Sequence, residues 1–155
     1  MMSRELKFRI ATVDDLRDIV RMLVDDFLGG TREKFEDTIS DDYMRAFREI
    51  ESDPNNELIV AELNSKVVGT FQMTYTPSLS FQGGKRCTIE SVRVDSSLRG
   101  QGIGREMMLW AIERAKEKGC ISMQLTTNSK RKNAHRFYER LGFESTHLGM
   151  KLKIK

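Results

Sequence analysis

The residues best suited to chemistry stand in one short stretch, from Arg99 to Arg105, in which Gly100, Gly102 and Gly104 occupy alternate positions. Glycine has no side chain to hold a ligand away from the backbone. Where such a stretch opens a helix, the first N–H groups lack partners within the helix, point in one direction and favour an anion. Arg99 and Arg105 add positive charge. The stretch therefore predicts a phosphate or pyrophosphate site.

The spacing of these glycines argues against two common nucleotide sites. A Walker A loop requires Gly-Lys followed by Ser or Thr, which the stretch does not contain. A dinucleotide-binding fingerprint requires G-x-G-x-x-G and an acidic residue about 20 positions later. The sequence instead has G-x-G-x-G, and Thr-Thr-Asn stands at 126–128, at the end of the next predicted strand. Neither kind of site accounts for the stretch.

The elements that must position this turn can be predicted from the spacing of apolar residues. Alternation of apolar and polar residues predicts strands, and apolar residues at helical spacing predict helices. The expected strands are 6–10, 57–63, 67–76, 86–95, 121–126 and 146–155, and the expected helices are 16–27, 41–52, 102–118 and 133–141. The pair Gly29-Gly30 should end the first helix. This interspersed order predicts a mixed α/β fold.

Length and composition predict a single domain spanning residues 1–155. With 39% hydrophobic and 32% charged residues, the chain is not of the disordered class. No apolar run reaches the roughly 18 residues that a membrane helix needs. The first residues contain no apolar segment of a secretory signal, and two cysteines are too few for a disulfide scaffold. We therefore expect a cytoplasmic protein.

Charge is distributed unevenly along the chain. Residues 1–62 hold 9 Lys or Arg against 16 Asp or Glu, a net −7, whereas residues 63–155 hold 17 against 7, a net +10. Two solvated faces would explain this pattern. The alternative is a cationic ligand near the first half and a polyanion near the second.

Two motifs resemble those of the GNAT acetyltransferase superfamily. The segment 99–104, Arg-Gly-Gln-Gly-Ile-Gly, is similar to its pyrophosphate motif R/Q-x-x-G-x-G/A, and the segment 134–143, Ala-His-Arg-Phe-Tyr-Glu-Arg-Leu-Gly-Phe, is similar to A-x-x-L/F-Y-x-x-x-G-F. The resemblance is specific over roughly 86–145 and only topological over 1–76. It implies a mostly antiparallel sheet of about six to seven strands, about four helices and a splayed parallel pair, here 88–94 and 121–126.

The resemblance also implies that acetyl-CoA is the co-substrate. The pantetheine arm would pair with the backbone of strand 88–94, where the amide of Val92 could polarise the thioester carbonyl. The implied cofactor-binding residues are Val92, Arg93, Val94, Arg99, Gly100, Gln101, Gly102, Ile103, Gly104, Arg105, Asn128, Arg131, Asn133, Phe137 and Tyr138. Many members carry Asn where this chain has Arg131, so the role of that Asn stays open among Asn128, Arg131 and Asn133. The run 130–132 is either a contact for the 3′-phosphate or a solvated loop.

The same resemblance implies direct attack of an amine on the thioester, which requires a base and an acid. Glu90 is the candidate base, because Glu is depleted in strands and this one shares the parity of Val92 and Val94; a bulge would break that parity. Tyr138 is the candidate acid. Tyr43, in the acidic first half with Asp41 and Asp42, is the candidate acceptor contact, although a solvated helix start would also explain the two Asp residues.

Other residues receive structural interpretations. His135 and His147 lack the spacing of metal ligands, and no metal site is expected. Cys87 and Cys120 are expected to be small buried residues. The acceptor would be a small-molecule amine or a protein amino group.

The sequence is also compatible with two other functions. The first is a non-catalytic acyl-CoA-binding sensor on the same fold. The second is a nucleic-acid-binding module, which the lack of aromatic residues interleaved with the basic run disfavours. We expect neither nucleic acid nor membrane as a partner. The alternating strand 146–154 could pair with a second copy in a homodimer.

Overall fold

The computed structural model describes residues 4–25 and 29–155. Its strands are β1 (Leu6–Ile10), β2 (Asn56–Leu63), β3 (Lys66–Thr76), β4 (Lys85–Val94) and β5 (Cys120–Gln124). Its helices are α1 (Leu16–Val24), α2 (Gly29–Arg32), α3 (Asp41–Ser52), α4 (Ser80–Gly83), α5 (Ile103–Glu117) and α6 (Lys132–Arg140), with 3-10 turns at Val13–Asp15 and Ser96–Leu98. The chain forms two compact units, Met1–Gln124 and Leu125–Lys155.

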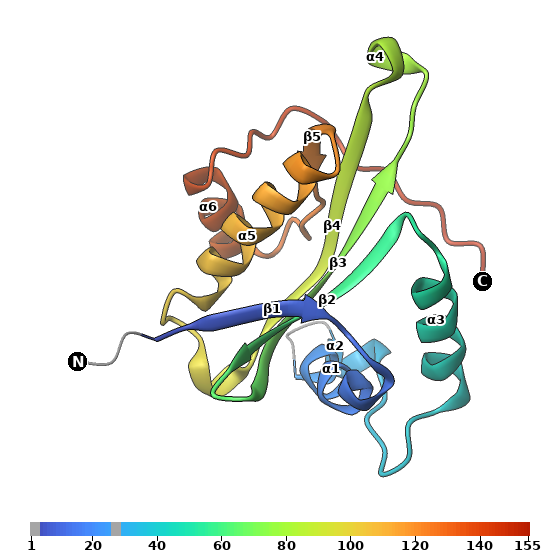
Figure 1. The fold of residues 1–155 in the computed structure, drawn as a ribbon, viewed down its shortest axis with the longest axis vertical. Coiled ribbons are helices and arrows are strands. Elements are labelled where there is room, and N and C mark those ends of the chain that lie inside the picture. Colours follow the sequence, from blue (N-terminus) through green and yellow to red (C-terminus); the bar gives the residue numbers. More distant parts are fainter. Residues whose placement is uncertain (1–3, 26–28) are drawn as a thin grey trace. The chain divides into compact units, whose positions relative to one another are not determined.

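One five-stranded sheet in the order β1-β2-β3-β4-β5 lies in the first unit (Figure 1). β1 to β4 pair antiparallel with one another in turn, whereas β5 runs parallel to β4. The predicted α/β class and parallel pair are therefore confirmed. The pairing of β4 with β5 ends at Thr88 and Gln124, although β4 continues to Val94. The last part of β4 thus lies beyond the end of β5.

The two faces of this sheet are covered by different helices (Figure 1). On one face, α5 packs on β3, β4 and β5 through buried residues that include Ile103, Met107 and Ala111, and Trp110 contacts Phe71 of β3. On the other face, α1 packs on β3 and β4, and α3 packs on β2. Leu16, Ile19 and Val20 of α1 are buried there at helical spacing. The amphipathic patterns thus form a three-layer arrangement within the first unit.

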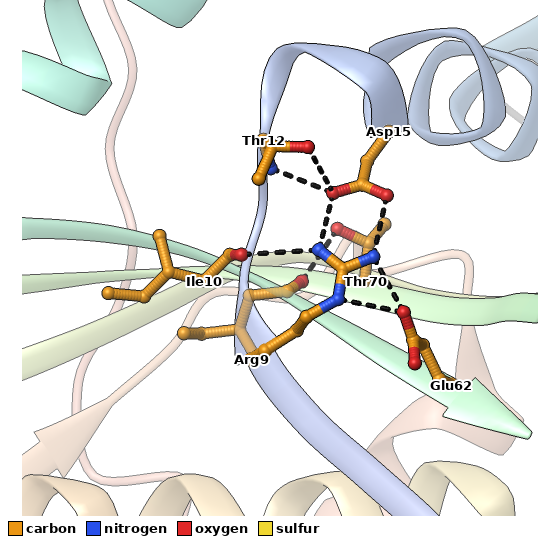
Figure 2. A network of polar contacts seen from close by, with 7 residues as sticks. Arg9, Ile10, Thr12, Asp15, Glu62 and Thr70 are labelled. Atoms are coloured by element: carbon orange, nitrogen blue, oxygen red, sulfur yellow. Dashed lines mark hydrogen bonds and ion pairs between the residues drawn. The ribbon is translucent and has the colours of Figure 1, made fainter. Parts of the chain in front are cut away.

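The start of α1 is fixed to the sheet by a network of charged side chains (Figure 2). Arg9 donates two hydrogen bonds to the carboxylate of Asp15, at 2.6 and 2.8 Å, and another to Glu62 at 2.7 Å. The backbone N–H of Thr12 donates to Asp15 at 2.7 Å. The hydrogen bonds from Arg9, together with this amide, hold the pKa of Asp15 below its usual value despite burial. Asp15 therefore anchors the helix that covers one face of the sheet.

The prediction of about six to seven strands is wrong, because residues 4–25 and 29–155 form five. The expected strand 146–155 is not formed, and Leu148, Met150, Leu152 and Ile154 along it are each about nine-tenths exposed. An alternating sequence becomes a strand only when an edge supplies hydrogen bonds and another layer covers its apolar side. Neither condition is met for this segment in the described residues of its unit.

Several predicted boundaries also differ. The first helix ends at Val24, and Gly29-Gly30 open α2 rather than ending α1. Phe27, predicted on the same helix face, lies outside the described residues. The strand predicted over 121–126 ends at Gln124. By contrast, α3 spans the predicted residues 41–52.

Candidate active site

The glycine-rich turn adopts the backbone that its sequence predicts. Gly100 and Gly102 have φ angles of 79° and 81°, in the left-handed region that residues with a Cβ avoid. Gly102 is the N-cap of α5, and the bond from the Glu106 N–H to the Gly102 carbonyl, at 3.1 Å, is the first of the helix. The N–H groups of Ile103, Gly104 and Arg105 precede that bond. They are therefore helix-start donors without helical partners, as an anion site requires.

The side chain of Ile103 holds this turn in place. It is 1% exposed and buried under the first turn of α5, so the helix start is fixed to the core. Arg4 donates to the carbonyl of Gln101 at 2.7 Å and forms an ion pair with Glu106. Arg105 is exposed. The turn is thus anchored to the core by Ile103 and to the residues before β1 by Arg4, while Gly100 and Gly102 stay exposed.

A second set of contacts joins the turn to α1. Arg99 donates to the backbone carbonyl of Asp25, at the end of α1, at 2.7 Å. Arg21 of α1 pairs with Asp95 at 3.2 Å, and Asp95 caps the following 3-10 turn by accepting from Ser97 N–H at 3.0 Å. The guanidinium of Arg99 is thus engaged with α1. Its contribution to the turn is structural as well as electrostatic.

A β-bulge interrupts β4 next to the candidate base. Gln72 of β3 pairs with Glu90, but Thr70 pairs with Arg93, so Phe71 alone stands opposite Ser91 and Val92. Ser91 has a φ of 53°. Since paired residues share a face of the sheet, Glu90 lies on the face of Gln72 and Arg93. The predicted shared parity of Glu90 with Val92 and Val94 is therefore wrong, because the extra residue shifts the alternation.

The backbone of Val94 points away from β3. The Asp95 N–H donates to the carbonyl of Val68 at 2.8 Å, and successive backbone groups of a strand point to opposite edges. The N–H and carbonyl of Val94 are therefore directed toward the side where β5 has already ended. This is the side on which an extended ligand could pair with β4. Val92 is half-buried and follows the bulge, and Arg93 is 8% exposed.

A cavity of about 140 Å³ opens on the same face as Glu90. We call it the α1–α3 cavity. It is lined by Leu16, Ile19, Val20 and Leu23 of α1, Tyr43, Ala46, Phe47 and Ile50 of α3, and Leu58, Thr70, Gln72 and Ser91 of the sheet. Ser91 belongs to the bulge and follows Glu90 directly. The cavity therefore reaches the bulge residue that follows the candidate base, and Glu90 itself is not among its lining residues.

Tyr43, the predicted acceptor contact, lines this cavity. Its hydroxyl donates to Glu33 at 2.6 Å and accepts from the backbone N–H of Lys34 at 3.0 Å. Burial, together with the hydrogen bond to Glu33, raises the pKa of Tyr43 above its usual value. Tyr43 is therefore a neutral hydrogen-bonding group beside a carboxylate. Asp41 and Asp42 are exposed at the start of α3.

The second unit carries the remaining predicted residues. Asn128 folds the approach to α6: its side chain accepts from Lys130 N–H and its carbonyl from Arg131 N–H, each at 2.9 Å. Arg131 is the N-cap of α6, and Asn133 is exposed on its first turn. The ring of Tyr138 makes edge contacts with Phe137 and Phe143 at 5.1 and 5.8 Å between centroids. These contacts fix the ring of the candidate acid within its own unit.

Cysteine chemistry is disfavoured by burial. Cys87 is 0% exposed, and burial raises the pKa of its thiol to about 12. Burial also raises the pKa of Cys120. A thiol is a nucleophile only as its thiolate. Among the residues that the structure describes, no group of three or more His, Cys, Asp or Glu could hold a metal ion, and no helix is long and apolar enough to cross a membrane.

Sequence reasoning missed the α1–α3 cavity. Its apolar lining was predicted only as helix faces, and Gln72 and Ser91 were not singled out. A signal was present in β3, where Thr70, Gln72 and Thr74 alternate with apolar residues and so mark a polar face. The extra residue at Ser91 left no such mark.

Comparison with known proteins identifies the family of the fold. Residues 18–143 match the model of the acetyltransferase (GNAT) family. A crystal structure of a Bacillus halodurans C-125 protein described as a transcriptional regulator is 51% identical, with a TM-score of 0.94, and covers 97% of this chain and 100% of its own. A Clostridium acetobutylicum protein solved with acetyl-CoA has the same fold, with 20% identity, a TM-score of 0.74 and 97% coverage of each chain.

Among curated relatives, the aminoalkylphosphonate N-acetyltransferase of Salmonella typhimurium is 36% identical over 97 residues, covering 61% of this chain and 61% of its own. The glucosamine 6-phosphate N-acetyltransferase of Trypanosoma brucei brucei is 32% identical over 89 residues, covering 57% and 58%. The match thus spans about three fifths of each relative's length.

Proposed function

The chain belongs to the acetyltransferase (GNAT) family, and we propose that it moves the acetyl group of acetyl-CoA to a primary amine by direct attack. The observation that carries this proposal is the start of α5, where left-handed Gly100 and Gly102 precede three helix-start N–H groups. This is the geometry that binds a diphosphate. The names of the curated relatives, which are N-acetyltransferases, support the same activity.

Cofactor binding is assigned to two segments. In the first unit, Arg99–Arg105 bind the diphosphate, and the backbone of Val92, Arg93 and Val94 pairs with the pantetheine arm. The direction of the Val94 backbone supports this second role, because its N–H and carbonyl are turned away from β3. In the second unit, Asn128, Arg131, Asn133, Phe137 and Tyr138 are assigned contacts with coenzyme A. The two units would act as a single domain over residues 1–155.

Glu90 acts as the base that removes a proton from the acceptor amine. A lysine-like amine has a pKa near 10.4, so only about one molecule in 2,500 is neutral at pH 7. Glu90 is exposed, and it stands on the same face of the sheet as Gln72, which lines the α1–α3 cavity. It accepts a proton from the amine, directly or through water. The nitrogen then forms its bond to the acetyl carbon.

Tyr138 supplies the proton that the leaving sulfur of coenzyme A requires. When the carbon–sulfur bond breaks, the electron pair leaves with sulfur as a thiolate, which resembles free Cys with a pKa of about 8.5. Tyr138 gives its phenolic proton to that sulfur and recovers one from solvent. The ammonium form of the acceptor loses two protons in all: Glu90 takes one before attack, and the second leaves the nitrogen for solvent after its bond to the acetyl carbon has formed. Tyr138 gives one proton to sulfur, so the products are an N-acetylated amine, free coenzyme A and one proton released to solvent.

Tyr138→Phe tests this assignment, because it removes only the hydroxyl and keeps the ring that contacts Phe137 and Phe143. Turnover should fall about 100-fold, within the usual range for loss of a general acid, while the Kd of acetyl-CoA changes less than about threefold. Steady-state kinetics and calorimetry give the two values. Turnover equal to that of the unaltered protein would reject Tyr138 as the acid.

A second candidate function is a non-catalytic acyl-CoA sensor. The 51% identity to a protein described as a transcriptional regulator favours it. The position of Glu90 beside a cavity favours the enzyme. Incubation with acetyl-CoA and a pooled amine panel, followed by assay of free thiol, separates the two. Thiol release that depends on an added amine supports the enzyme, and acetyl-CoA binding without such release supports the sensor.

We also propose a cytoplasmic location and a homodimer formed through the segment 146–154. Its four apolar side chains at alternate positions are about nine-tenths exposed, which supports pairing with a second copy. Light scattering after gel filtration measures the mass. Met150→Lys and Leu152→Lys together should convert a dimer to a monomer, whereas a monomeric unaltered protein would reject the dimer.

A further inference from the structure

The lining of the α1–α3 cavity is poorly suited to a phosphorylated substrate. Most of its lining is aliphatic or aromatic, and none of the described residues that line it is Lys, Arg or His. A buried or half-buried phosphate needs a cationic partner or a set of unpaired N–H donors such as a helix start, because removal of its charge from water is otherwise costly. The residues that line the cavity include no cation.

Three of the four polar side chains that line the cavity, all but Ser91, already donate hydrogen bonds within the protein. Thr70 donates to the carbonyl of Ile59 at 2.9 Å, and the amide of Gln72 donates to Asn56 at 3.0 Å. The hydroxyl of Tyr43 donates to Glu33. An acceptor would therefore gain little by hydrogen bonding to these three side chains. Its affinity would have to come from contact with the apolar walls.

Two carboxylates and one guanidinium lie next to residues that line the cavity. Arg93, opposite Thr70 in the sheet, is 8% exposed and donates to the carbonyl of Val92 at 3.0 Å. Glu33 is bonded to Tyr43 on one wall, and Glu90 stands beside Ser91 and across from Gln72. Carboxylates in these places attract an ammonium group and repel a phosphate. The apolar walls and these two carboxylates therefore favour the same molecule, one with an uncharged body and a cationic head.

The volume of the cavity limits the size of that body. A cavity of about 150 Å³ with walls of Leu, Ile and Phe is large enough to bind benzene, and the α1–α3 cavity measures about 140 Å³. A body held there lies next to Ser91, the residue that follows Glu90 in the chain.

We infer that the acceptor is a primary amine on an uncharged apolar body, about the size of a phenyl ring or a six-carbon chain, and that amines bearing a phosphate or phosphonate are rejected. This inference rests on the proposed function. It separates this chain from the relatives named for aminoalkylphosphonate and glucosamine 6-phosphate. Those names place an anionic group on the acceptor, for which the α1–α3 cavity has no counter-charge.

Two pairs of amines test the inference. 2-Phenylethylamine and hexylamine carry apolar bodies, whereas 2-aminoethylphosphonate and glucosamine 6-phosphate carry anionic ones. The first pair should give kcat/KM values at least about 100-fold above the second, in the range that an apolar pocket achieves with bodies of different size and polarity. Equal values, or a preference for the phosphonate, would overturn it.

A matched pair of variants ties the selectivity to the cavity. Ala46 lines the cavity from an exposed position on α3, so Ala46→Phe should fill its mouth with little effect on folding. Glu49, also exposed on α3, does not line it and takes the same substitution as a control. Ala46→Phe should raise KM for 2-phenylethylamine at least about tenfold and leave the Kd of acetyl-CoA unchanged, while Glu49→Phe should change neither. Equal effects of the two substitutions would contradict the inference.

A direct measurement of amine binding tests the inference without any turnover. Calorimetry with 2-phenylethylamine in the presence of coenzyme A should show saturable binding that Ala46→Phe weakens. If the amine binds in this way but no thiol is released, the proposed function fails and the inference about the cavity stands. If thiol is released only with other amines and 2-phenylethylamine does not bind, the inference fails alone.

Discussion

The glycine-rich turn and the α1–α3 cavity are built in opposite ways. The turn is made of seven consecutive residues, 99–105, and its donors belong to the backbone at the start of one helix. The cavity is assembled from α1, α3 and three strands, and side chains form its walls. A site of the first kind depends on local conformation, whereas one of the second depends on tertiary packing. A cofactor shared by a family suits the first, and an acceptor that varies among its members suits the second.

The two regions are nevertheless joined mechanically. Arg99 donates to the last turn of α1, and Arg21 of that helix pairs with Asp95 just before the turn. α1 therefore supplies walls of the cavity and also holds the segment that leads to the turn. We nevertheless expect a substitution in the turn to affect mainly acetyl-CoA binding, and a substitution in the cavity to affect mainly amine binding.

The largest expected effect is on the cavity side. Glu90→Gln removes the candidate base without a change of size, and turnover at neutral pH should fall about 100- to 10,000-fold. Only amine that is already neutral would then react, so the rate should continue to rise with pH toward the pKa of the acceptor. Rates measured from pH 6 to pH 10, with Glu113→Gln on the exposed face of α5 as a control, give this profile. An unchanged profile would remove Glu90 from the role of base.

The next effect belongs to the turn. Gly102→Val places a β-branched residue at a φ of 81° and should weaken acetyl-CoA binding about 100-fold, equal to about 2.7 kcal/mol. Gly119, at the other end of α5, has a φ of 77° and open space where a Cβ would stand, so Gly119→Val imposes the same backbone strain without an anion site. Similar losses of affinity in both variants would mean that stability, not the turn, controls binding.

The smallest expected effect concerns the anchor of α1. Asp15→Asn should lower the free energy of unfolding by about 1–2 kcal/mol at pH 7, a value discounted because Arg9 is 38% exposed. Because the hydrogen bonds from Arg9 lower the pKa of Asp15 in the folded state, its stabilisation is complete above the unfolded value of about 3.8 and is lost as pH falls through the folded value. The difference in free energy of unfolding between the unaltered protein and Asp15→Asn should therefore disappear in acid.

Urea unfolding from pH 7 to pH 2.5 measures that gap, with the exposed neighbour Asp14→Asn as the control. The Asp15 variant should also raise KM for the amine more than it changes the Kd of acetyl-CoA, since Asp15 positions a wall of the cavity. An equal weakening of the binding of both ligands would show that α1 supports the turn and the cavity alike. A gap that stays constant in acid would contradict the lowered pKa.

The contrast also explains what could be predicted from the sequence. The turn and α3 follow from local signals, the glycine spacing in the first and the apolar residues at helical spacing in the second. The bulge at Ser91 depends on the partner strand, where Phe71 faces two residues, and no local pattern marks it. It reversed the deduced parity of Glu90 and Val94. The segment 146–155 shows the converse, since a clear alternation formed no strand where nothing paired with it.

The central claim is that the amides at the start of α5 bind the diphosphate of coenzyme A. Isothermal titration of the purified protein with acetyl-CoA tests it most directly, with Gly102→Val titrated beside it. The account predicts saturable binding at one site per chain that the variant weakens about 100-fold. No heat of binding in the unaltered protein, or equal affinity in the variant, would contradict it.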